Sequence, residues 1–138
     1  MQSATATAAV PNKKLIWLGR VMSFVPAAFL FFGSFVNVLL LPAAVEGTRQ
    51  FGYPASATRP IGIVLLISVI LYLVPRTAVF GAILLTGYFG GAVATHLHHG
   101  DPSMFLVIPV FVSALLWGGL YLREPRLRAL IPLRNPEL

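Results

Sequence analysis

Three histidines and an aspartate lie close together, at His96, His98, His99 and Asp101. Imidazole and carboxylate groups suit zinc, copper or iron, and the three-residue spacing of His96 and His99 on a helix would bring two ring nitrogens to one face. A closed metal site usually needs four ligands, and the next candidate, Glu46, is far away in the sequence. Histidines at the end of an apolar helix are more commonly solvated, so we predict no metal site.

A lipid-soluble quinone is a second kind of ligand that this stretch could hold. Its head group needs a hydrogen-bonding side chain near the membrane surface, and its ring and tail need an apolar, aromatic-lined slot. His96 with Thr86, Tyr88 and Phe89 could supply both. The same side chains also occur in bundles that bind nothing, so quinone binding is a hypothesis. Haem is disfavoured because its two axial ligands would have to come from different helices.

The elements that position these residues follow from composition. The chain has 138 residues, of which 57% are hydrophobic and only 10% charged, against about 25% charged in a soluble domain. A spanning helix needs about 20 mainly apolar residues, and four stretches without Lys, Arg, Asp or Glu are candidates for one. We therefore predict an all-α fold, a bundle of four transmembrane helices over residues 15–41, 57–75, 77–99 and 103–122.

The segments outside the spans are short. Residues 1–14 read as a flexible tail and 124–138 as a second tail, which leaves 15–123 as the membrane domain. In the first loop, Ala43 to Gln50 has the composition of a short helix stopped by Gly52. Cysteine is absent, which excludes disulfides and thiolate chemistry within the chain.

The distribution of the basic residues predicts the topology. Eight of the ten Lys and Arg residues lie around the start of the first span, after the fourth span, or in the loop between the second and third spans. Only Arg49 and Arg59 lie in the other two loops. The positive-inside rule then places both termini in the cytoplasm and the loops around Tyr53 and Asp101 outside. The net charge of +6 therefore reflects topology and contact with the lipid bilayer, and we predict no nucleic-acid partner.

One face of the third span is almost without side chains. Gly87 and Gly91 form a GxxxG pair, and Gly90 and Ala94 lie beside it. Small residues at this spacing let another helix approach closely. We therefore predict that these four residues pack against a helix of the same chain or of a partner.

Several runs of residues resemble the DoxX-like membrane proteins of bacteria. These are GYP at Gly52, LYLVPRTAVFGAILLTGYFGGAVATH from Leu71 to His96, GDP at Gly100, and LLWGGLYLREPRLRAL from Leu115. The resemblance implies a four-helix protein of the bacterial cytoplasmic (inner) membrane. It also implies a quinone-linked redox role, because the family takes its name from a subunit associated with thiosulfate:quinone oxidoreductase.

These observations lead to one functional hypothesis and two alternatives. The chain is expected to be a quinone-linked redox subunit that binds a hydrophobic small molecule near the outer face, in a redox complex with a membrane partner or as a homo-oligomer. The alternatives are a non-catalytic scaffold and, less favoured, a carrier of small solutes. An enzymatic activity is left open, and quinone is the one candidate cofactor. The predicted ligand-binding residues are His96, Asp101, Glu46, Tyr53, Tyr88 and Thr86.

Overall fold

The chain forms an all-α bundle in the computed structural model, which describes residues 12–131. Four helices are long and apolar enough to cross a membrane, which confirms the predicted fold class. Their orientation across the membrane stays a prediction. The helices in chain order are α1 (Lys13–Val38), α2 (Pro42–Gln50), α3 (Thr58–Leu73, preceded by the 3₁₀ turn η1, Ala55–Ala57), α4 (Ala78–His99), α5 (Ser103–Arg123) and α6 (Pro125–Arg128).

Local interactions set the two ends of α1. The helix begins at Lys13 because the Asn12 side chain accepts a hydrogen bond from the Lys14 amide (3.1 Å) and caps the first turn. It ends at Val38, short of the expected residue 41, and Leu40 then adopts a positive φ of 56°. A residue with a Cβ, such as leucine, rarely adopts this backbone conformation. The positive φ of Leu40 turns the chain sharply into α2.

The two predicted tails fall largely on residues 1–11 and 132–138, which lie outside the described residues. Within the described part of the second tail, the chain continues as the short helix α6. Glu124 caps it by accepting a hydrogen bond from the Arg126 amide (3.3 Å). Leu127 of this helix is buried against the bundle.

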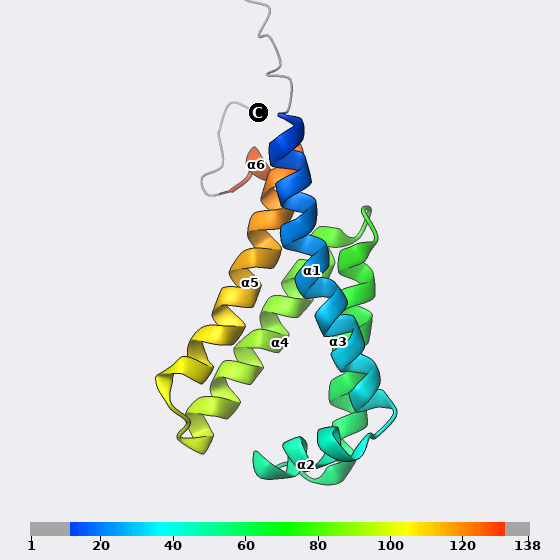
Figure 1. Ribbon diagram of the computed structural model, residues 1–138, viewed down its shortest axis with the longest axis vertical. Helices are drawn as coiled ribbons and strands as arrows, with labels where there is room; N and C mark the ends of the chain where they lie inside the picture. Colours follow the sequence, from blue (N-terminus) through cyan, green and yellow to red (C-terminus); the bar gives the residue numbers. More distant parts are fainter. Residues whose placement is uncertain (1–11, 132–138) are drawn as a thin grey trace, which may run out of the picture.

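The four long helices converge at one end of the bundle and spread apart toward the other (Figure 1). We call the end where α1 begins and α5 ends the terminal end, and the opposite end the α2 end. α1 packs on α3 and α5, and α4 packs on the other side of the same two helices. Toward the α2 end, α1 and α3 form one arm and α4 and α5 the other, with α2 lying across the base (Figure 1).

Tyr72 is the residue on which the four helices converge. Its side chain is fully buried. The hydroxyl donates a hydrogen bond to the Leu116 carbonyl of α5 (2.7 Å) and lies 2.9 Å from the Ser23 hydroxyl of α1. The backbone of Tyr72 lies directly against Gly81 of α4, with no room for a Cβ there. One residue of α3 therefore contacts the other three long helices.

Glycines allow close helix approach at both ends of α1. A Cβ at Gly119 of α5 would lie 2.7 Å from the Gly19 carbonyl oxygen, and a Cβ at Gly62 of α3 would lie 2.6 Å from the Asn37 Cβ. Neither pair of non-bonded atoms can approach that closely without a shift of the backbone. Because Gly19 is near the start of α1 and Asn37 near its end, α1 is close to α5 at the terminal end and to α3 at the α2 end.

The glycines of α4 that were expected to form a packing seam do not pack within the described chain. A Cβ added at Gly87, Gly90 or Gly91 would meet nothing within 4 Å, and Ala94 is exposed. The helix presents this side to open space, whereas Gly81, about two to three turns earlier, carries the close contact with α3. Contact of the exposed glycines with a partner stays a prediction.

We expect Gly81→Ala to destabilise the bundle, and Gly90→Ala to leave its stability unchanged or raise it. A methyl group at Gly81 overlaps the backbone of Tyr72, and overpacking of this kind costs about 1–3 kcal/mol. At Gly90 the methyl group has space, and alanine is the better helix former. Thermal unfolding of both variants in one detergent tests this. A melting temperature of Gly81→Ala equal to that of the wild type would contradict the packing described above.

Candidate functional site

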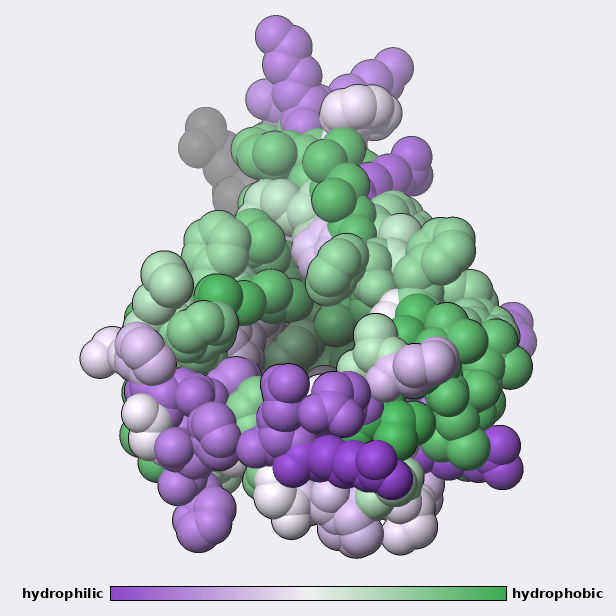
Figure 2. Space-filling view, turned by 60° about the horizontal axis from the view of Figure 1, so that its bottom comes forward, coloured by the Kyte–Doolittle hydropathy of each residue, from purple (hydrophilic) through white to green (hydrophobic). Residues whose placement is uncertain are grey.

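A cavity of about 570 Å³ lies at the α2 end, between the two arms. Its lining comes from α1, α2, α3, α4 and the segment after α2, and none of it comes from α5. Figure 2, which looks toward the α2 end, shows this hollow between largely apolar walls, with polar residues in front of it. The polar side chains in the lining are those of Asn37, Thr48, Tyr53, Tyr88, Thr95 and His96.

The end of α4 places a carboxylate beside two histidines. Gly100 adopts a left-handed φ of 80°, and its amide donates to the Leu97 carbonyl (3.2 Å) while the Asp101 amide donates to the His96 carbonyl (3.1 Å). This pair of hydrogen bonds is the Schellman motif, which requires a residue that tolerates positive φ. The turn folds Asp101 back over the last turn of α4, next to the ring nitrogens of His96 and His99.

The end of α2 has the same motif and places Tyr53. Gly52 has a φ of 82°, its amide donates to the Arg49 carbonyl (2.9 Å), and the Tyr53 amide donates to the Thr48 carbonyl (3.2 Å). The Tyr53 hydroxyl then lies 2.9 Å from the Thr95 hydroxyl of α4. In both turns, therefore, the residue after the left-handed glycine contributes a polar side chain to the site.

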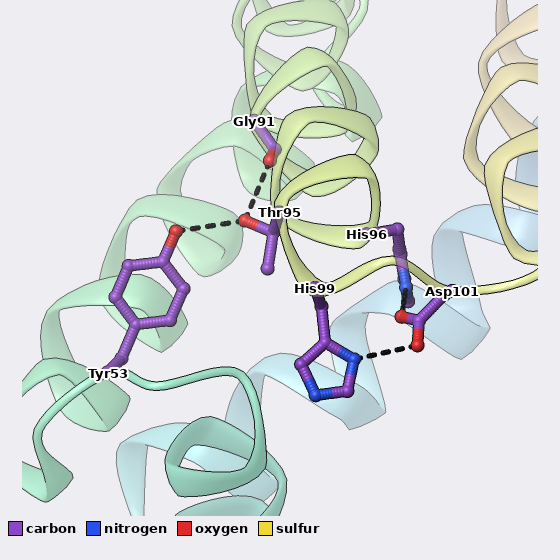
Figure 3. A network of polar contacts seen from close by, with 6 residues as sticks. All are labelled: Tyr53, Gly91, Thr95, His96, His99 and Asp101. Carbon is purple, nitrogen blue, oxygen red and sulfur yellow. Dashed lines mark hydrogen bonds and ion pairs between the residues drawn. The ribbon is translucent and has the colours of Figure 1, made fainter.

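The Tyr53 hydroxyl is the donor in its contact with Thr95. The single hydroxyl proton of Thr95 is donated to the Gly91 carbonyl (2.9 Å), so Thr95 can only accept from Tyr53. Figure 3 shows the chain of two hydrogen bonds from Tyr53 through Thr95 to Gly91. It ties the segment after α2 to the wall of the cavity formed by α4.

Three neighbours hold the ring of His96. Its Nδ1 lies 2.6 Å from one carboxylate oxygen of Asp101, whose other oxygen lies 2.7 Å from Nδ1 of His99 (Figure 3). Phe51 meets the His96 ring edge-on, with the ring centroids 4.9 Å apart. Phe105 of α5 stacks on it, with the centroids 5.8 Å apart. The position of the ring in the cavity wall is therefore set from the segment after α2, from α5 and from the turn after α4.

Asp101 also determines which nitrogen of His96 carries a proton. The hydrogen bonds from His96 and then His99 hold the pKa of the Asp101 carboxyl below its usual value of 3.8. A carboxylate only accepts hydrogen bonds, so Nδ1 of His96 is the protonated nitrogen. The free nitrogen is Nε2, and His96 is one of the residues that line the cavity. A neutral His96 thus offers an acceptor, and a protonated one offers a donor held beside a carboxylate.

Other polar groups of the lining have already used a donor within their own helix. Asn37 donates to the Gly33 carbonyl (2.9 Å) and Thr48 to the Ala44 carbonyl (2.9 Å), as Thr95 does to Gly91. Each of these bonds reaches back four residues. Such bonds satisfy hydroxyl and amide protons in an apolar environment and leave the oxygens as acceptors. Polar side chains therefore line the cavity without leaving these donors unpaired.

The structure brings together four of the six predicted ligand-binding residues. His96, Tyr53 and Tyr88 line the cavity, and Asp101 holds His96 from outside the lining. Glu46 is exposed on α2 and does not line the cavity. Thr86 accepts a hydrogen bond from the Trp117 indole (2.7 Å) and lines a second, apolar cavity of about 390 Å³ between α4 and α5.

Sequence reasoning missed Asn37, Thr48, Phe51 and Thr95 as lining residues. None of the four belongs to a sequence motif of known chemistry. The one signal that could have found Thr95 is its position one turn before His99 and two turns after Gly87, on the face of α4 that the glycines leave open.

His98 takes no part in this cluster. It is exposed and does not line the cavity, whereas His96 and His99 turn their Nδ1 atoms toward the same carboxylate. Over residues 12–131, no group of three or more His, Cys, Asp and Glu side chains is arranged to hold a metal ion. The arrangement favours proton and hydrogen-bond chemistry at His96.

The fold and the cavity together define a small multi-pass membrane protein with a ligand-sized, mainly apolar site at one end of its bundle. The chain belongs to the DoxX-like family, which it matches over residues 21–119, more than half of its length. The match runs from the first turns of α1 to the last turns of α5 and confirms the resemblance found in the sequence. No curated protein and no solved structure matches the chain.

We expect the stabilising effect of Asp101 to depend on pH in a defined direction. Its pKa is lowered in the folded state, so its contribution is fully present above the ordinary value of 3.8 and is lost as the pH falls through the lower, folded value. Asp101→Asn should therefore lower the melting temperature at neutral pH, and the difference from wild type should shrink below pH 3.8. A difference that stayed constant down to the most acidic pH would contradict the carboxylate contacts.

We expect Tyr53 and Thr95 to contribute to stability as a coupled pair. Tyr53→Phe and Thr95→Val each remove the hydrogen bond between them, which is worth about 0.5–1.5 kcal/mol. If the bond forms, the double variant should be less destabilised than the sum of the single variants. Chemical or thermal unfolding of the four proteins in detergent measures this coupling. Strict additivity would show that the segment after α2 is not tied to α4.

Proposed function

We propose that the cavity binds the head group of a lipid-soluble quinone and that the protein acts as a membrane subunit of a redox assembly. The observation that carries this proposal is the pairing of His96 with Asp101 at the cavity wall. The pairing leaves Nε2 as the ring nitrogen free for a ligand, near the polar end of a mainly apolar space. This is the combination of groups that a quinone head requires.

The pair suits both oxidation states of the ligand. A hydroquinone hydroxyl donates to the free Nε2 of neutral His96. When the hydroquinone is oxidised, it gives two electrons to the redox partner and loses two protons. One proton passes to Nε2, where the Asp101 carboxylate 2.6 Å from Nδ1 stabilises the resulting charged ring, and the other is released to water at the polar end of the cavity. In the reverse direction, protonated His96 donates from Nε2 to a quinone carbonyl. His96 is thus the proposed proton-exchanging residue, and Asp101 positions it.

Aromatic rings and hydroxyl groups complete the proposed site. Phe51 and Tyr88 line the cavity and offer flat apolar surfaces to a quinone ring. Tyr53 closes the side toward α2 through its bond to Thr95. A volume of about 570 Å³ lies within the roughly 300–1,000 Å³ that is usual for small-ligand sites.

The electrons of such a reaction would pass to or from a partner. The chain has no cysteine, so neither a dithiol nor a thiolate-bound cluster of its own can exchange them. We therefore propose a membrane-associated redox protein as the partner. The distribution of basic residues and the family support placement in a bacterial cytoplasmic membrane, with the α2 end facing outward.

A scaffold function is the second candidate, and one observation favours it. Gly87, Gly90 and Gly91 contact no other described residue at the position of a Cβ, so this side of α4 could receive a helix of another protein. In that case, bulky substitutions would disrupt an assembly and leave small-molecule binding unaffected. The ligand experiments below separate the two functions.

We expect His96→Ala to weaken quinone binding by at least about tenfold, the loss that corresponds to one hydrogen bond of about 1.4 kcal/mol. His98→Ala is the matched control, because His98 is a neighbouring histidine that is exposed and does not line the cavity. Binding is measured with a radiolabelled quinone and purified protein in lipid nanodiscs. Wild-type protein that binds no quinone, or equal losses in both variants, would contradict the proposed function.

A further inference from the structure

We propose that the cavity opens to the lipid through the face of α4 at Gly87 and Gly91, and that its ligand is a molecule with a polar head and a long apolar tail that leaves by this opening. The inference rests on the proposed function and adds to it the route of the tail and the class of ligand. It assigns to the exposed glycines a role other than helix packing.

The cavity changes in character along α4. His96 and Thr95 lie in the last turns of the helix, together with Tyr53 from the segment after α2. Gly87 lines the same cavity roughly 13 Å farther along the helix axis from His96, at about 1.5 Å per residue. This places Gly87 near the middle of a span, at the depth of the hydrocarbon. A ligand in this space has its polar part at the membrane boundary and its apolar part at mid-depth.

The wall at Gly87 and Gly91 is open. Both glycines are exposed, and an added Cβ at either would meet nothing within 4 Å. They lie one turn apart on the face of α4 that also carries Thr95. α3 and α4 are in close contact at Tyr72 and Gly81, at the other end of the bundle, and spread apart toward the α2 end (Figure 1). Ile61 of α3 and the two glycines of α4 line the same cavity, so the proposed tail passes between these helices at the level of the glycines.

The side toward α2 is more obstructed. Phe51 lies against both His96 and His99, with centroid distances of 4.9 and 5.3 Å, and Tyr53 is hydrogen-bonded to Thr95 across the cavity edge. A ligand arriving from water would have to displace these contacts. A ligand arriving from the lipid meets two residues without side chains.

The size of the cavity also argues for a tail outside it. About 570 Å³ holds a head group and a short substituent, since volumes of this order fit compact, drug-sized molecules. A long isoprenoid chain needs a continuation beyond the cavity. The surface of α4 between its start and the glycines, where Phe80 and Ile83 are exposed, is apolar and compatible with such a chain.

The inference is tested with two quinones that share one ring, one carrying a long isoprenoid tail and one carrying only methyl groups. The variant Gly87→Leu/Gly91→Leu fills the opening, and Gly90→Leu is the matched control. Gly90 is equally uncovered but lines the second cavity between α4 and α5. Because none of the three substitutions meets a described atom at the Cβ, the proteins are expected to fold, and their melting temperatures are measured first.

We expect the double variant to bind the long-tailed quinone at least about tenfold more weakly than wild type, and to lose much less affinity for the tail-less quinone. Gly90→Leu should bind both as wild type does. Unchanged binding of the long-tailed quinone in the double variant would overturn the lipid route, and so would an equal loss of both ligands, which would place the glycines in the head-group site. If wild-type protein bound neither quinone, the proposed function itself would fail.

Discussion

The shape of this protein depends on the close contacts at one end of its bundle. Tyr72 of α3 reaches α1 and α5 through its hydroxyl group and leaves no space for a side chain at Gly81 of α4. Lipid offers no hydrophobic driving force between helices, so association depends on such close packing and on interhelical hydrogen bonds. With these contacts concentrated at the terminal end, the arm of α1 and α3 separates from the arm of α4 and α5 toward the α2 end (Figure 1), and the cavity lies in that separation.

The polar residues of the site are placed by helix ends. A spanning helix satisfies its own backbone hydrogen bonds, and its last carbonyl groups need donors from beyond the helix. Gly52 and Gly100 supply them through the same turn, and the following residues, Tyr53 and Asp101, are thereby directed back over the helices. The placement of these polar side chains thus follows from the way in which α2 and α4 terminate. The orientation of His96 depends on that turn, through the contact of its Nδ1 with Asp101, as well as on its own position in α4.

The sequence was sufficient to predict the helices and the family, but it was not sufficient to predict how the helices face each other. Charge-free stretches and proline or glycine stops locate the spans, because bilayer thickness and backbone geometry act locally. The rotation of each helix is different. All sides of a spanning helix are apolar, so periodicity does not distinguish the side that meets another helix from the side that meets lipid. For this reason the sequence did not show that Thr86 faces α5 and that the α4 glycines meet no other described helix, and Thr95 was overlooked.

Small residues therefore have two opposite consequences in the same bundle. Helix backbones come into contact at Gly19, Gly62, Gly81 and Gly119. The absence of a side chain there lets two helices approach closely. No backbone of another described helix lies against Gly87 and Gly91. The absence of a side chain there enlarges the cavity. The difference lies in the position along α4: Gly81 lies where α3 and α4 are joined, and Gly87 and Gly91 lie where they have separated. A spanning helix that is tightly held at one end and lined with glycine beyond it provides both a rigid frame and an opening at mid-depth. In the proposed site, the polar end near His96 and the apolar opening near Gly87 are then two parts of one cavity, which extends along α4.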